Sequence, residues 1–179
     1  METKPITPAT AGIVIGLSSV VLFLVYYFTG LVFQQGWTAW MPALVYAILV
    51  IVFICIFSNA KSNFVTFGEC FGFGFKSICI ASLIIFFFTL AFIYFTPEYK
   101  DQFMQVSREQ ARQNKQATSE QIEVGIKWVA DHFMLIVIGF GLFINVLTGL
   151  IASLIGAAIA KKKPVTPFTQ INQIGTPES

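Results

Sequence analysis

Only a few residues of this sequence could carry out acid–base, nucleophilic or metal chemistry, and they lie far apart. His132 is the only histidine, and Cys55, Cys70 and Cys79 show no Cys-x-x-Cys spacing. No Ser/His/Asp grouping, metal-ligand spacing or phosphate-binding loop can be assembled from these residues. We therefore expect a protein that is not an enzyme and that uses no cofactor and no metal.

Glu69 is the only acidic residue close to a long apolar segment on the side of the membrane that we predict to be cytoplasmic. It ends the sequence Thr66-Phe67-Gly68-Glu69, which fits a capping box in which Thr66 and Glu69 satisfy each other's backbone amides. The pattern predicts that a helix begins at Phe67, with Thr66 and Glu69 as a candidate cap on the cytoplasmic side. A partner role toward Lys76 or Lys61, and a proton or ion site, are the alternatives for Glu69.

Asn145 lies near the middle of a long apolar segment. A carboxamide in hydrocarbon is expected to find a hydrogen-bond partner on another helix. The candidate partners are backbone carbonyls and the hydroxyls of Ser19, Ser82 and Thr89. Contact with a substrate is the alternative to this structural role.

The elements that must position these residues are four long apolar stretches. We predict membrane-spanning helices over about residues 11–33, 41–57, 77–95 and 133–160, since a helix of about 20 residues crosses the hydrocarbon core. The chain is 56% hydrophobic and 11% charged, whereas an average soluble domain is about 25% charged. This composition excludes a water-soluble globule, and a net charge of +2 gives no argument for nucleic-acid binding.

The long charged segment between the third and fourth apolar stretches differs from the rest of the chain. Thr96-Pro97-Glu98 is typical of a helix start, and Thr118 to Gln121 fits a second capping box. Residues 97–131 therefore predict a helical hairpin with a break near residues 114–118. A partly mobile hairpin is the alternative to a folded one.

The distribution of Lys and Arg favours an orientation with both termini in the cytoplasm. Lys161, Lys162 and Lys163 directly follow the last span, whereas the connection over residues 34–40 carries no positive charge. Residues 97–131 would then be extracytoplasmic. We predict an all-α polytopic membrane protein with one four-helix transmembrane domain over residues 1–163 and a flexible cytoplasmic tail over 164–179.

Small residues at four-residue spacing predict where the helices pack most closely. The first span has a Gly-x-x-x-Gly motif, and the last span has two ridges, Gly149/Ser153/Ala157 and Ala152/Gly156/Ala160. We therefore expect the last span at the centre of the bundle. The candidate packing or interaction residues are Gly12, Gly16, Asn145, Gly149, Ser153 and Gly156. The alternative is that the ridges serve only the protein's own bundle.

The chain resembles the four-span bacterial membrane family called domain-of-unknown-function family 4199 (DUF4199). The resemblance covers nearly the whole chain and rests on the glycine-rich first span and on the segments Thr66–Lys76, Ser119–Glu123 and Ala157–Pro164. Where the family usually has Ala-Phe-Lys after the glutamate, this chain has Cys70-Phe71-Gly72 and so lacks one positive charge. The resemblance implies the four-span fold and a place in the bacterial inner (plasma) membrane. It transfers no catalytic residue, because the family carries no assigned activity.

Two hypotheses for the function follow. The first is an accessory or scaffold subunit, whose partners are the lipid bilayer and either another membrane protein or a second copy of the chain. The second is a small transporter or channel for an unidentified solute. Transport usually needs ionisable groups inside the bilayer, and none lies deep in the four apolar stretches. The sequence therefore favours the first hypothesis.

Overall fold

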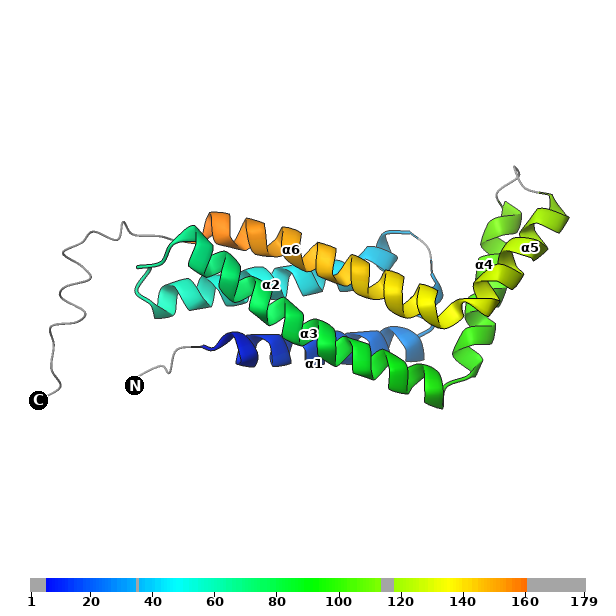
Figure 1. Cartoon of the computed structure of the whole chain (residues 1–179), viewed down its shortest axis with the longest axis horizontal. Helices are drawn as coiled ribbons and strands as arrows, with labels where there is room; N and C mark the ends of the chain where they lie inside the picture. The colour runs from blue at the N-terminus through cyan, green and yellow to red at the C-terminus, as the bar shows by residue number, and fades with distance from the viewer. Residues whose placement is uncertain (1–5, 35, 114–117, 161–179) are drawn as a thin grey trace, which may run out of the picture.

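A computed structural model describes residues 6–34, 36–113 and 118–160 of the chain. The regular elements in these ranges are all helical, which confirms the predicted all-α class. Figure 1 shows the long helices running side by side and the shorter helices at one end of the bundle. The long helices are α1 (Pro8–Phe28), α2 (Met41–Ala60), α3 (Phe67–Phe95) and α6 (Gly141–Ile159), and the short ones are α4 (Glu98–Gln113) and α5 (Ser119–Asp131).

Four helical segments are long and apolar enough to cross a membrane, as the sequence predicted. They run over Pro8–Phe28, Trp37–Ala60, Phe67–Phe95 and Leu135–Ile159. Two of these segments begin with a turn that is not α-helical. Trp37–Trp40 is a 3₁₀ turn before α2, and Leu135–Phe140 is a wider π-helical turn before α6. The chain is therefore a multi-pass membrane protein.

The first span is shorter than its predicted range of 11–33. Helix α1 ends at Phe28, where the Thr29 hydroxyl donates to the Val25 carbonyl at 2.7 Å. Gly30 then adopts a φ of +73°, which ends an α-helix at little steric cost only for glycine. The last residues of the apolar stretch form a separate 3₁₀ turn over Leu31–Phe33.

Both predicted capping boxes are present. Thr66 accepts from the Glu69 amide at 3.2 Å, and Glu69 accepts from the Thr66 amide at 2.8 Å, so α3 begins at Phe67. Thr118 and Gln121 make the same reciprocal pair at the start of α5. Each box satisfies two amides that the first turn of a helix leaves without a backbone partner.

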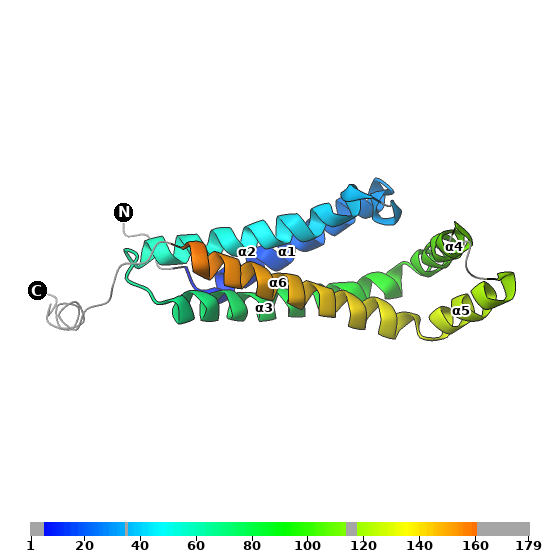
Figure 2. The ribbon, with the colours of Figure 1, turned by 90° about the horizontal axis from the view of Figure 1, so that it is seen from above.

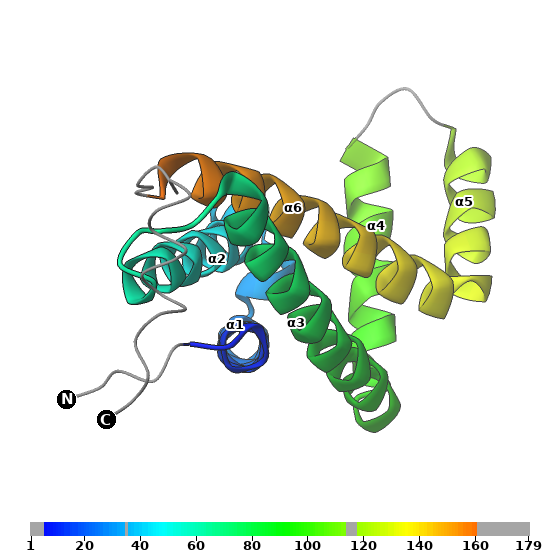
Figure 3. The same cartoon turned by 60° about the vertical axis from the view of Figure 1, so that its left-hand side comes forward.

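The packing of the bundle centres on α3 and not, as predicted, on the last span. Helix α3 packs against α1, α2 and α6, whereas α6 packs mainly against α2 and α3. Figure 3 shows α1 on the side of α3 away from α6. The reason is that α1 presents its two packing glycines to the face of α3 around Ser77 and Ala81.

Helices α4 and α5 form a hairpin across one end of the bundle (Figure 2). Ile122 and Ile126 of α5 are buried, and the Arg108 side chain of α4 meets the Glu123 carboxylate at 3.1 Å. This confirms that the charged segment forms two helices. The predicted break falls partly on residues 114–117, and these lie outside the described residues together with Lys161–Lys163 and the predicted tail over 164–179.

Tyr99 joins the hairpin to the bundle. Its ring is buried and lies near the rings of Phe23, Tyr27, Phe33, Phe92 and Phe133, with centroid separations from 5.4 to 6.4 Å. Burial raises the pKa of the Tyr99 hydroxyl, and the neighbouring Tyr27 raises it further. The hydroxyl therefore stays neutral in an apolar setting between the spans and the hairpin.

Candidate functional site

The glycines predicted to pack helices closely lie between the chain's own helices. An ideal Cβ on Gly12 would come within 2.6 Å of the Ser77 carbonyl oxygen, and one on Gly16 within 3.2 Å of Ala81 Cα. On α6, a Cβ on Gly149 would meet the Ile78 side chain at 3.0 Å, and one on Gly156 would meet Ile54 Cδ1 at 2.9 Å. These positions hold α1 against α3 and α6 against α3 and α2, which favours the alternative that the ridges serve the protein's own bundle.

Ser153 contributes a hydrogen bond as well as its small size. The residue is fully buried, and its hydroxyl donates to the Phe71 carbonyl of α3 at 3.2 Å. Gly74 lies opposite Ser153, where a side chain on α3 would collide with the hydroxyl. The bond satisfies a polar group inside the bundle and ties α6 to α3.

Glu69 fills two of its three predicted roles at once. Besides capping α3, its carboxylate pairs with Lys61 Nζ at 3.6 Å, with both side chains about half exposed. In the described part of the chain, no group of three or more His, Cys, Asp or Glu side chains is placed to hold a metal ion. Thr66 and Glu69 therefore organise one end of the bundle and lie apart from the pocket around Asn145.

Asn145 has one of its predicted partners. The Ser82 hydroxyl of α3 donates to Asn145 Oδ1 at 3.5 Å. The other two candidates turn back on their own helices, because Ser19 donates to the Ile15 carbonyl and Thr89 to the Ile85 carbonyl, each at 2.8 Å. Asn145 thus bridges α6 to α3 and stays beside these hydroxyls.

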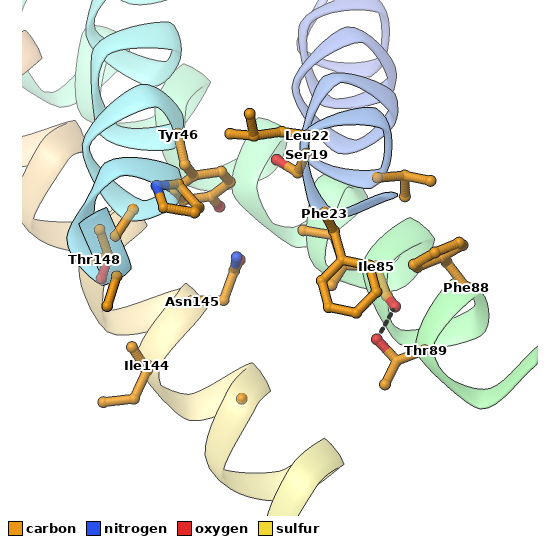
Figure 4. Close-up of a pocket in the computed structure, with 15 residues that line it drawn as sticks. Ser19, Leu22, Phe23, Tyr46, Ile85, Phe88, Thr89, Ile144, Asn145 and Thr148 are labelled. Carbon is orange, nitrogen blue, oxygen red and sulfur yellow. Dashed lines mark hydrogen bonds between the residues drawn. The ribbon is translucent and has the colours of Figure 1, made fainter. Parts of the chain in front are cut away.

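Asn145 also lines a pocket of about 270 Å³ between the four spans (Figure 4). The pocket lies in the half of the bundle nearer the α4–α5 hairpin. None of the described residues that line it is charged. Its apolar walls include Leu22, Phe23, Pro42, Ile85, Phe88 and Ile144, and its polar residues are Ser19, Tyr46, Thr89, Asn145 and Thr148.

Tyr46, like Thr148, is a polar residue of this pocket that sequence reasoning missed. The residue is only 3% exposed, and its hydroxyl has no hydrogen-bond partner among the described residues. Ser82 lies beside it, but the Ser82 hydroxyl donates to Asn145. A tyrosine within an apolar span was the available signal, since a buried phenol usually finds a partner. Its proximity to Asn145 could not be inferred, because the two residues lie on different helices.

The π-helical turn over Leu135–Phe140 precedes the part of α6 that lines the pocket. Gly139 lies within this turn and Gly141 follows it, and Gly141 lines the pocket. The helix widens at this turn and continues as α6. Such turns are frequent at functional sites.

The family model described as "Protein of unknown function (DUF4199)" matches residues 10–162 of the chain. No curated protein and no solved structure matches the sequence.

Proposed function

The chain belongs to the DUF4199 family of proteins of unknown function, and on that premise we propose that it is an accessory or scaffold subunit of the bacterial inner membrane. In this proposal the α4–α5 hairpin binds a partner membrane protein on the extracytoplasmic side. The observation that carries the proposal is an apolar side of α5 that no described part of the chain covers. Val124 and Trp128 on this side are 66% and 58% exposed.

The hairpin is free to present this side because α4 and α5 pack mainly against each other. Ile122 and Ile126 fill the inner side of α5, and Val124 and Trp128 are four residues apart, so they share another side of the helix. A large exposed aromatic residue beside an aliphatic one is typical of the centre of a protein interface. This favours a protein partner that covers Trp128.

We expect a photo-crosslinking residue at Val124 to capture one discrete protein in native membranes. The captured protein should co-purify with the chain at a fixed ratio in mild detergent. Trp128→Ala should abolish the co-purification, because it removes the largest exposed side chain of the surface. Trp37→Ala is the matched control, since Trp37 is 73% exposed and lies in the turn before α2.

A second crosslinking site at Phe87 serves as the lipid-facing reference, because this side chain is exposed on the middle of span α3. Adducts to lipid alone at both sites would contradict the proposal. Purification of the chain without a partner, with the hairpin still folded, would contradict it as well.

We propose further that both termini are cytoplasmic, on the strength of Lys161–Lys163 and of a first connection without positive charge. A topology reporter inserted next to Ser119 should then be active only outside the cytoplasm. A reporter fused after Lys163 should be active only inside. The opposite pair of activities would show an inverted protein and would place the hairpin on the cytoplasmic side.

A small transporter or channel for an unidentified solute is the second candidate. The pocket around Asn145 favours it, because a solute site near the middle of a bundle is what transport requires. On the side of the pocket away from the hairpin, the helices are in close contact at Gly12 and Gly156. Transport would therefore need these contacts to separate, and we rank this function second.

A further inference from the structure

Two side chains, Tyr46 and Asn145, offer hydrogen-bond donors to the pocket between the spans. Figure 4 shows Tyr46 on α2 and Asn145 on α6 extending toward each other. Asn145 Oδ1 accepts from Ser82, and the buried Tyr46 hydroxyl has no hydrogen-bond partner among the described residues. A buried donor without an acceptor is costly and rare. The arrangement therefore points to an acceptor that binds between them.

The lining also limits the charge of that acceptor. None of the described residues that line the pocket is Lys or Arg, so a carboxylate or phosphate would lose its hydration without gaining a cation. None of them is Asp or Glu either, so a cationic ligand would be left unpaired as well. An uncharged carbonyl oxygen fits, because it accepts two hydrogen bonds and carries no net charge.

The size and position of the pocket point to a lipid-soluble molecule. A volume of about 270 Å³ holds a small ring or a short acyl segment, and most of the wall is aliphatic or aromatic. Ala39 lines this pocket and also a groove between the first connection and α4, which includes Trp40, Tyr99 and Phe103. The pocket therefore lies next to this groove, at the end of the bundle that carries the hairpin.

We propose that the pocket binds an uncharged, lipid-soluble molecule whose carbonyl oxygen accepts hydrogen bonds from the Tyr46 hydroxyl and the Asn145 amide. Two sources share this chemistry, a quinone ring and the ester of an uncharged glycerolipid. The site is independent of the partner surface on α5, because Val124 and Trp128 do not line it.

The test measures the unfolding temperature of the full chain in lipid nanodiscs during titration with three probes. Decylbenzoquinone carries ring carbonyls, dioctanoylglycerol carries ester carbonyls, and decylbenzene has the ring and tail without an oxygen. We expect a saturable rise with at least one carbonyl probe, because a ligand that binds only the folded state stabilises it by mass action. The probe that gives the rise identifies the source, and decylbenzene should give none.

Tyr46→Phe is the decisive variant. It should fold as stably as the wild type, because the hydroxyl that it removes makes no hydrogen bond within the described chain. It should lower the affinity for the carbonyl probe about three- to tenfold, as expected for the loss of one neutral hydrogen bond. Asn145→Leu should lower this affinity at least as much. Tyr94→Phe is the matched control, since Tyr94 lies at the exposed outer end of α3 and lines none of these cavities.

Three results would overturn the proposal. The first is that neither carbonyl probe shifts the unfolding temperature in a saturable way. The second is that decylbenzene shifts it equally, which would indicate general partition into apolar space. The third is that Tyr46→Phe and Asn145→Leu both bind the active probe as tightly as wild type.

Discussion

Alanine at Gly12 is expected to lower the free energy of unfolding by about 1–3 kcal/mol, the range for overfilling a packed interior. The added methyl group would lie 2.6 Å from the Ser77 carbonyl oxygen and 2.7 Å from Ile80 Cβ. The oxygen belongs to the backbone of α3, so it cannot move away alone. Helix α1 must therefore separate from α3 around the buried residues Ile15 and Ala81.

Gly72→Ala provides a matched control for this prediction. It makes the same change within a span, but a Cβ on Gly72 would meet no atom within 4 Å. Alanine is the better helix former by about 1 kcal/mol, so Gly72→Ala should be neutral or stabilising. Reversible unfolding in mixed micelles measures the change in the free energy of unfolding for both variants. Equal changes would show that helix propensity, and not the α1–α3 contact, determines the effect of alanine at Gly12.

The sequence predicted the features that depend on local chemistry. The spans follow from long stretches without charge, and both capping boxes follow from side chains that lie three residues apart. The predicted bounds of the spans were less accurate, because the end of α1 depends on the backbone conformation of Gly30. The packing role of Gly12 and Gly156 was predicted from spacing, although their partner helices were not.

The pocket could not be predicted in the same way. It depends on which helices are neighbours, and the connection between α1 and α2 does not reveal that α1 packs mainly against α3. Asn145 was identified because a carboxamide is conspicuous in an apolar stretch. Tyr46 was overlooked because it lies near the start of α2, and tyrosine is common where spans meet the membrane surface. Its missing partner can be recognised only once Gly149 and Ser82 are placed around it.

The other large effect is expected at Tyr99. Tyr99→Ala should lower the free energy of unfolding by about 3–4 kcal/mol, within the range for removing a buried aromatic ring. Five aromatic rings from α1, α3, the Leu31–Phe33 turn and the start of the last span surround Tyr99 and would lose contacts. The hairpin should loosen first, because this ring links α4 to the spans.

Amide hydrogen exchange by mass spectrometry can locate this effect. In Tyr99→Ala, exchange should accelerate over α4 and α5 and remain slow where Gly12 packs on α3, because that contact lies at the other end of the bundle. Tyr94→Ala is the matched control, since it removes the same side chain five residues earlier from a position that is 79% exposed. Uniform acceleration along all helices would mean that the hairpin and the bundle unfold as one unit. In that case the ring of Tyr99 would support the whole fold, and the hairpin could not move independently when a partner binds.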